Sequence, residues 1–356
     1  MTHQWQTPSA LLGQALLSSL PEWLQQALAD IDAKAMLLSE GLSNANYRLC
    51  CPQGDWVLRD NRPQSLWCNR EQELANWRLA EAAGLAPALI WHSDDKRVYL
   101  SCFVAQIRPW SSVMSHENNS LCIEPPLTES GPLDNVTALE VFDEATPVSL
   151  LLNLLRPLSQ LTVPDVALTP RAQWQEYLAR LTELARAMPS SPSSVNSQSN
   201  LTSPKKTHLS SQWHSAFTQL SSLATEIERW LVQLESCLVA DQYCHRDLNP
   251  TNLLLVGDKL QCIDFEYATA SHPLFELASV ITSHKLTPKQ RDSLIEQYLA
   301  FNPNVKPSGV EAMPAAINCY WLCCAAWALL MAAEQDEECQ TQYLAYFKQY
   351  LQLITI

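Results

Sequence analysis

Positive charge is scarce in this sequence. The 356 residues include 23 Lys and Arg against 37 Asp and Glu, which gives a formal net charge of −14. A nucleic-acid-binding protein needs a basic face for the phosphates, so this balance argues against nucleic acid as a partner. An acidic surface is compatible with a cationic small substrate, although it more often only keeps a protein in solution.

Long hydrophobic runs are also missing. The longest apolar segment, Cys319 to Ala333, is shorter than the roughly 20 residues that a membrane-spanning helix needs. We therefore expect a buried core helix there and no membrane insertion. With 47% hydrophobic and 17% charged residues, the chain can build a substantial core, in two lobes or one large domain.

The 12 cysteines lack the C-x-x-C spacing of common zinc and redox motifs. A signal peptide is not expected, because residues 1–7 are polar and residues 9–20 look amphipathic. These patterns predict reduced, mostly buried thiols and a cytoplasmic location.

What the sequence does contain is a motif suited to phosphoryl transfer. It consists of His245-Arg246-Asp247-Leu248-Asn249-Pro250-Thr251-Asn252 and, shortly after, Cys262-Ile263-Asp264-Phe265-Glu266. Asp247 can accept the proton of an attacking hydroxyl, and Asn252 and Asp264 can hold the Mg²⁺ that neutralises the transferred phosphate. The catalytic loop of protein kinases has the same His-Arg-Asp start, with an Asn five residues after the Asp.

The residues between the two halves of the motif favour this interpretation. Residues 253–256, a turn at 257–259 and residues 260–263 have the pattern of a β-hairpin. Such a hairpin would bring Asn252 and Asp264 together at its open end. The alternative is a purely structural hairpin, flanked by turn-forming Asn and Asp, with Asp247 as a cap.

The rest of the chain predicts an α+β protein with a protein-kinase-like bilobal fold. Alternating residues predict a small antiparallel sheet, a helix begins after Asn69, and helical periodicity dominates the remainder. The expected strands are Ala35–Leu38, Tyr47–Cys51, Trp56–Arg59, Leu89–Trp91 and Val98–Val104. The expected parts are a helical extension (1–34), a nucleotide-binding lobe (35–104) and a helical lobe (105–356), with flexible polar insertions near 115–147 and 188–211.

A kinase also needs a cation on the nucleotide phosphates and a carboxylate that orients this cation. Arg59, at the end of a predicted strand, can contact two phosphate oxygens, although it could be an ordinary surface residue. Glu73 is the expected partner, since Glu71 would face another side of its helix. Ser43 and Asn44 would cover the phosphates, in a loop with one glycine where protein kinases have several.

His245 could be a general base, but a His at this position of the loop more often packs inward. We expect a structural role for His245, because Asp247 already occupies the position of the base.

In this order the motifs resemble the aminoglycoside phosphotransferase and choline kinase superfamily, and most closely its choline, ethanolamine and thiamine kinase branch. The resemblance rests on the segments 41–47, 69–73, 84–87, 263–268 and 274–278, and covers roughly residues 40–334 without the polar insertions. It implies ATP and Mg²⁺ as cosubstrates and a small hydroxyl-bearing acceptor. The sequence departs from the family at Glu276, where Asp is usual, and in residues 154–161, which lack a usual His. Phe-Glu after Asp264, and the absence of an Ala-Pro-Glu segment, argue against a kinase that acts on proteins.

The expected activity is transfer of the ATP γ-phosphoryl group to a small alcohol that contains an amine. In choline kinases an aromatic and acidic pocket holds the amine, and the resemblance suggests Glu266, Trp321 and Trp327 for this role. Core packing of these aromatic residues is at least as good an interpretation. An aminoglycoside or homoserine phosphotransferase, and a nucleotide-binding regulatory protein without catalysis, remain alternatives. The sequence reveals neither the acceptor nor the oligomeric state.

Overall fold

The structure is a computed structural model, and it describes residues 4–40, 44–61, 68–106, 108–114, 146–188, 210–334 and 337–355. The predicted insertions lie outside these residues for nearly all of their length, as does Ser43. The chain divides into two compact units, each assembled from separate segments. Unit 1 comprises residues 1–162, 245–269 and 283–298, and unit 2 comprises residues 163–244, 270–282 and 299–356.

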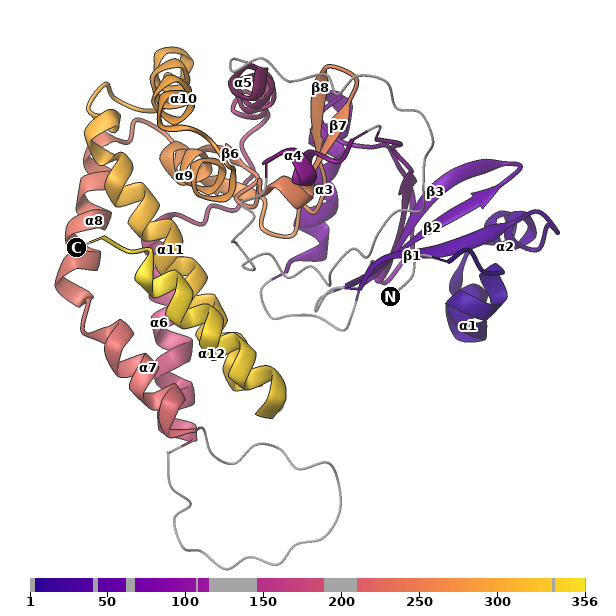
Figure 1. The fold of residues 1–356 in the computed structure, drawn as a ribbon, viewed down its shortest axis with the longest axis horizontal. Helices are drawn as coiled ribbons and strands as arrows, with labels where there is room; N and C mark the ends of the chain where they lie inside the picture. Colours follow the sequence, from indigo (N-terminus) through magenta and orange to yellow (C-terminus); the bar gives the residue numbers. More distant parts are fainter. Residues whose placement is uncertain are drawn as a thin grey trace, which may run out of the picture. The chain divides into compact units, whose positions relative to one another are not determined.

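Unit 1 contains an antiparallel sheet, in which five strands of the described chain pair in the order β1-β2-β3-β5-β4. Figure 1 labels β1, β2 and β3 of this sheet. The strands are β1 (Lys34–Glu40), β2 (Asn44–Cys51), β3 (Gly54–Asn61), β4 (Leu89–His92) and β5 (Val98–Cys102). Two short helices, α1 (Pro8–Ser19) and α2 (Glu22–Leu28), precede the sheet. Their apolar residues join a core with the strand residues Leu49, Leu58 and Leu100, so the predicted extension packs on the sheet.

Helix α3 (Arg70–Ala82) lies between β3 and β4 in the chain and begins as the sequence predicts. The side chain of Asn69 caps it by accepting hydrogen bonds from the amides of Glu71 and Gln72. After the C-terminal cap, Gly84 has a φ of 74°, a left-handed conformation that glycine adopts without strain. Unit 1 also contains α4 (Trp110–Met114), α5 (Thr146–Leu158) and most of α10 (Pro288–Phe301).

The phosphoryl-transfer motif forms the remaining part of unit 1. A 3-10 turn, η1 (Pro250–Asn252), leads into the antiparallel hairpin of β7 (Leu253–Val256) and β8 (Lys259–Cys262). In this hairpin Leu253 pairs with Cys262 and Val256 pairs with Lys259. The predicted hairpin is therefore present, and its second strand begins one residue earlier than expected, at Lys259, because the turn is shorter.

Unit 2 is mainly helical. It contains α6 (Pro170–Ala187), α7 (Ser211–Ser221), α8 (Ala224–Cys237), α11 (Gly309–Glu334) and α12 (Glu337–Gln352), together with β6 (Gln242–Cys244) and most of β9 (Thr269–Ser271) and α9 (Pro273–Ser283). Helix α11 runs between the other long helices and contacts α6, α7, α8 and α12 (Figure 1). It is long and apolar enough to cross a membrane, but 72% of its most apolar stretch is buried within the structure, as expected for a core helix.

The mixture of an antiparallel sheet and many helices confirms the predicted α+β class. The predicted boundaries of the three parts, at residues 34 and 104, stay a prediction. The two compact units are each built from several separate segments and so do not correspond to these parts.

Candidate active site

The hairpin places Asn252 and Asp264 together at its open end. Asn252 directly precedes β7, and Asp264 follows β8 by two residues. The amide of Ile263 donates a hydrogen bond of 3.0 Å to the carbonyl of Asn252, which extends the ladder to these positions. The carboxylate and the side-chain amide suggested as metal ligands are thus held by neighbouring backbone.

Asp247 is fixed by two side-chain amides. Nδ2 of Asn249 donates to Oδ1 of Asp247 at 2.9 Å, and Nδ2 of Asn252 donates to Oδ2 at 2.8 Å. Burial raises the pKa of Asp247 to about 6, and the negative charge of Asp264 adds to this rise while the two amides oppose it. An aspartate with this pKa can accept a proton near neutral pH.

Arg59 and Glu73 face each other inside unit 1. Arg59 comes from β3 and Glu73 from α3, and Nη2 of Arg59 lies 3.5 Å from Oε1 of Glu73. The other carboxylate oxygen of Glu73 accepts hydrogen bonds from Arg70 at 2.7 Å and from the hydroxyl of Tyr99 at 3.0 Å. Glu71 instead forms an ion pair with Lys96 on the exposed side of the helix. The helix therefore presents Glu73, and not Glu71, to Arg59.

Arg59 also contacts the two acidic residues that follow the hairpin. Its Nη1 lies 3.0 Å from Oδ1 of Asp264, and its Nη2 lies 3.9 Å from Oε2 of Glu266. Burial opposes the charge of Arg59, but the surrounding carboxylates raise its pKa above the ordinary value. The pKa of Glu266 is raised as well, because this carboxyl is buried and lies near Asp264.

Helix α3 is attached to the segment after Asp264 by side chains that the sequence analysis did not identify. Asn76 and Gln72 donate to the carbonyl of Ala268, at 2.6 and 3.2 Å. The indole of Trp77 stacks on the ring of Phe265, with 5.8 Å between the ring centroids. These contacts hold the helix that carries Glu73 against the loop that carries Asp264.

Strained backbone marks both halves of the motif. Arg246 has a φ of 69° and Asp264 a φ of 68°, left-handed values that cost free energy in residues other than glycine. Such conformations persist where the surroundings enforce them, and they cluster at active sites.

His245 contributes to these surroundings. Its ring is fully buried, its Nε2 lies 3.0 Å from the carbonyl oxygen of Ile263, and its ring centroid lies 4.9 Å from that of Phe265. Burial lowers the pKa of His245 to about 4. These contacts support the structural role expected for His245.

Asn44, Trp321 and Trp327 are also predicted site residues, and they lie in β2 and α11. Asn44 is buried at the start of β2, where its side-chain oxygen accepts a hydrogen bond from Asn46 at 3.0 Å. Trp321 and Trp327 are half-buried in α11 of unit 2, and both pack on aromatic residues of α12. Trp321 stacks on Tyr350 at 5.7 Å, and Trp327 meets the edge of Tyr343 at 5.7 Å.

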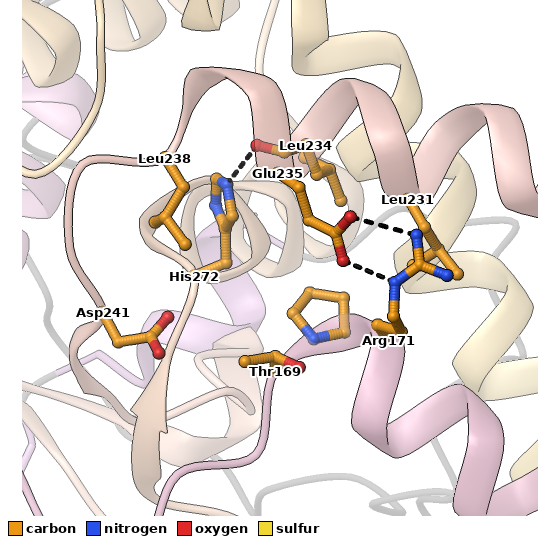
Figure 2. Close-up of a pocket in the computed structure, with 9 residues that line it drawn as sticks. Thr169, Arg171, Leu231, Leu234, Glu235, Leu238, Asp241 and His272 are labelled. Carbon is orange, nitrogen blue, oxygen red and sulfur yellow. Dashed lines mark hydrogen bonds and ion pairs between the residues drawn. The ribbon is translucent and has the colours of Figure 1, made fainter.

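Unit 2 contains a small pocket of about 50 Å³ where α6, α8 and the segments around Asp241 and His272 meet (Figure 2). Arg171 is paired with Glu235 at 2.5 Å, and Nε2 of His272 lies 2.9 Å from the carbonyl oxygen of Leu234. None of the residues suggested for catalysis lines this pocket. It is therefore a feature separate from the candidate active site.

Residues 134–308 match the model of the phosphotransferase enzyme family. The chain carries a phosphotransferase-family segment. This segment includes Asp247, Asn252 and Asp264. The match confirms the prediction that the protein is a phosphotransferase. Arg59 and Glu73 lie outside the segment.

Individual proteins show the same likeness. Protein LicA of Haemophilus influenzae is 37% identical over 86 residues, which cover 24% of this chain and 32% of LicA. A choline/ethanolamine kinase family protein from Mesorhizobium loti has a similar structure, with a TM-score of 0.59 and 18% identity, over 96% of this chain and 93% of that one. A structure of LicA in complex with AMP has a TM-score of 0.53 and 13% identity, over 93% and 96% of the two chains.

These findings confirm the predicted resemblance to the aminoglycoside phosphotransferase and choline kinase superfamily, and the kinase-like fold. The similarity to the Mesorhizobium loti structure covers 96% of this chain, so it includes the sheet with Arg59 as well as the phosphotransferase segment.

Proposed function

We propose that this protein is an ATP-dependent kinase that transfers the γ-phosphoryl group to a hydroxyl of a small, amine-containing alcohol. The observation that carries the proposal is the linked arrangement of the suggested residues. Asp247 is bonded to Asn252, the backbone of Asn252 is bonded to that of Ile263, and the neighbouring Asp264 is paired with Arg59. Phosphoryl transfer needs a base, oxygen ligands for a metal and a cation for the phosphates in one place.

Asp247 is the proposed catalytic base. Its carboxylate would orient the acceptor hydroxyl and take its proton as the oxygen attacks the γ-phosphorus. The amides of Asn249 and Asn252 hold the carboxylate in one orientation. The pKa of about 6 leaves Asp247 mostly ionised at neutral pH, yet basic enough to assist the transfer.

Asn252 and Asp264 are the proposed Mg²⁺ ligands, and their geometry fits this role. Asn252 turns its Nδ2 to Asp247, and among the described residues no donor reaches its Oδ1. Asp264 shares Oδ1 with Arg59, while no described residue donates to its Oδ2. Each thus keeps an oxygen available, and oxygen is the ligand that Mg²⁺ prefers. When bound, the ion would neutralise charge on the transferred phosphoryl group.

Arg59 would position the nucleotide phosphates. Its guanidinium can contact two phosphate oxygens. Ion pairs with Glu73 of α3 and with Asp264 after the hairpin hold the guanidinium in place. Ser43 and Asn44 remain proposed contacts of the phosphates. LicA, whose fold is similar, has been solved in complex with AMP, and this supports the proposal that this protein also binds a nucleotide.

The acceptor is proposed to be of the choline, ethanolamine or thiamine type. Relatives of this fold include a choline/ethanolamine kinase family protein. Trp321 and Trp327 offer aromatic faces suited to an alkylated amine, and Glu266 offers a carboxylate. The packing of the two indoles on α12 also fits a structural core, and the choice of acceptor distinguishes the two roles.

A screen of ADP release against choline, ethanolamine, thiamine, homoserine and aminoglycosides tests the proposal. We expect release with one amine-containing alcohol, detection of its phosphate ester by phosphorus-31 NMR, and no turnover by the Asp247→Asn variant. Turnover with homoserine or an aminoglycoside would replace the proposed acceptor. Binding of ATP without turnover across the whole panel would favour a regulatory nucleotide-binding protein.

A further inference from the structure

The side chain of Asn249 is used at both of its ends. Its Oδ1 accepts hydrogen bonds from the backbone amides of Thr251 and Asn252, at 2.9 and 3.3 Å, and so caps the turn η1. Its Nδ2 donates to Oδ1 of Asp247 at 2.9 Å. One residue therefore ties the shape of the loop to the orientation of the proposed base.

The bond from Asn249 complements the bond from Asn252. The two carboxylate oxygens of Asp247 each accept from a different side-chain amide. Two donors at opposite ends of a carboxylate fix both its χ angles, whereas one donor leaves the plane of the carboxylate free to turn. Of the two, Asn252 is also a proposed metal ligand, but Asn249 is not.

The residue type suits this double use. An asparagine side chain has an acceptor oxygen and two donor hydrogens, so it can cap and donate at once. Serine and aspartate cap such turns about as well as asparagine. An ionised aspartate has no hydrogen to give to Asp247, and a serine hydroxyl is too short to reach it while capping.

We propose that Asn249 is a positioning residue for phosphoryl transfer, which holds the carboxylate of Asp247 in the orientation that receives the acceptor hydroxyl. This inference rests on the proposed function. It assigns to Asn249 an effect on the chemical step and none on binding of the nucleotide, because Asn249 contacts neither Arg59 nor Glu73 in the described structure.

Two substitutions separate the two uses of the side chain. Asn249→Ser keeps a capping oxygen and loses the donor, whereas Asn249→Ala loses both. We expect kcat to fall by about tenfold to a hundredfold in both variants, because a catalytic group that is misplaced by about 1 Å can lose up to about a hundredfold in rate. KM for ATP should stay within about twofold of the wild type. Asn249→Ala, which also loses the cap, should unfold at a lower urea concentration than Asn249→Ser.

Thr251→Ala is the matched control. Its hydroxyl contacts Oδ1 of Asn249 at 2.5 Å but does not touch Asp247, so kcat should stay close to the wild-type value. The parameters are measured by ADP release with the acceptor identified in the screen, and folding by urea titration.

The possible failures are distinct. Wild-type kcat in Asn249→Ser, with the cap intact, would overturn the inference and leave the proposed function standing. A rise of KM for ATP with unchanged kcat would also overturn it, because that result would assign Asn249 to nucleotide binding. No product from the wild type with any acceptor would overturn the proposed function and this inference together.

Discussion

Nη1 of Arg59 lies 3.0 Å from Oδ1 of Asp264, so a strand residue and the acidic residue after the hairpin, 205 positions apart in the sequence, form a partly buried ion pair. Glu73 and Glu266 approach the same guanidinium. One guanidinium thus contacts three carboxylates, of which Glu73 is also paired with Arg70. Its removal should be far more costly than the loss of an exposed pair.

Arg59→Ala should lower the free energy of unfolding by about 3–5 kcal/mol, because Asp264 and Glu266 lose the cation that they share. Glu73 keeps its ion pair with Arg70. Arg59→Lys, which keeps the charge but not the planar donors, should lose less. Arg97→Ala is the control, since Arg97 forms an exposed ion pair with Asp60 whose loss should cost at most about 1 kcal/mol. Urea unfolding of the three variants measures these values, and equal losses for Arg59→Ala and Arg97→Ala would contradict the expectation.

Gln72 and Asn76 should be coupled, because both donate to the carbonyl of Ala268. Either single alanine substitution leaves this carbonyl one donor and should cost about 1 kcal/mol. The double variant leaves a buried carbonyl without either donor, so its loss should exceed the sum of the single losses. A double-mutant cycle from urea unfolding gives the coupling energy, and strictly additive losses would show that the shared acceptor has no energetic consequence.

The same two residues show where prediction from the sequence ends. Arg59, Glu73, Asp247, Asn252 and Asp264 belong to motifs with a fixed order, and the hairpin is local enough that its alternating residues and its Gly257 turn specify it. The bonds from Gln72 and Asn76 reach 196 and 192 positions along the chain. Polar residues on a helix carry no periodic signal of such a partner, so only the folded structure reveals them.

The interleaving of the two units was beyond sequence analysis for a similar reason. Hydrophobic periodicity identifies an element and its buried face, but it does not state which distant element covers that face. Helical periodicity therefore predicts a helical second lobe, whereas the packing of α6 and α8 on α11 comes from the structure. The double use of Asn249 was hidden because Asn-Pro is an ordinary turn signal.

Substitution of Trp321 should separate an amine-binding role from a purely structural one. The ring stacks on Tyr350 and also contacts Tyr320, so Trp321→Leu should cost about 1–3 kcal/mol in unfolding free energy under either interpretation. If the indole also binds the acceptor, KM for the acceptor should rise about tenfold, while KM for ATP stays unchanged. Trp213→Leu, which removes an indole buried elsewhere in unit 2, controls for loss of stability alone. An unchanged KM for the acceptor in Trp321→Leu would assign this tryptophan to the core.

The low pKa of His245 predicts how stability depends on pH. Burial lowers the pKa to about 4, below the ordinary value of 6.5, so the folded protein keeps this ring neutral while the unfolded chain binds a proton. Stability from this residue is fully present above pH 6.5 and is lost as the pH falls towards 4, with a slope of about 1.4 kcal/mol per pH unit. In His245→Gln, whose amide can still donate to the carbonyl of Ile263, the loss over this range should be shallower. Urea unfolding at pH 7, 6 and 5 compares the two proteins, and equal slopes would mean that His245 titrates in the folded state as it does in the unfolded chain.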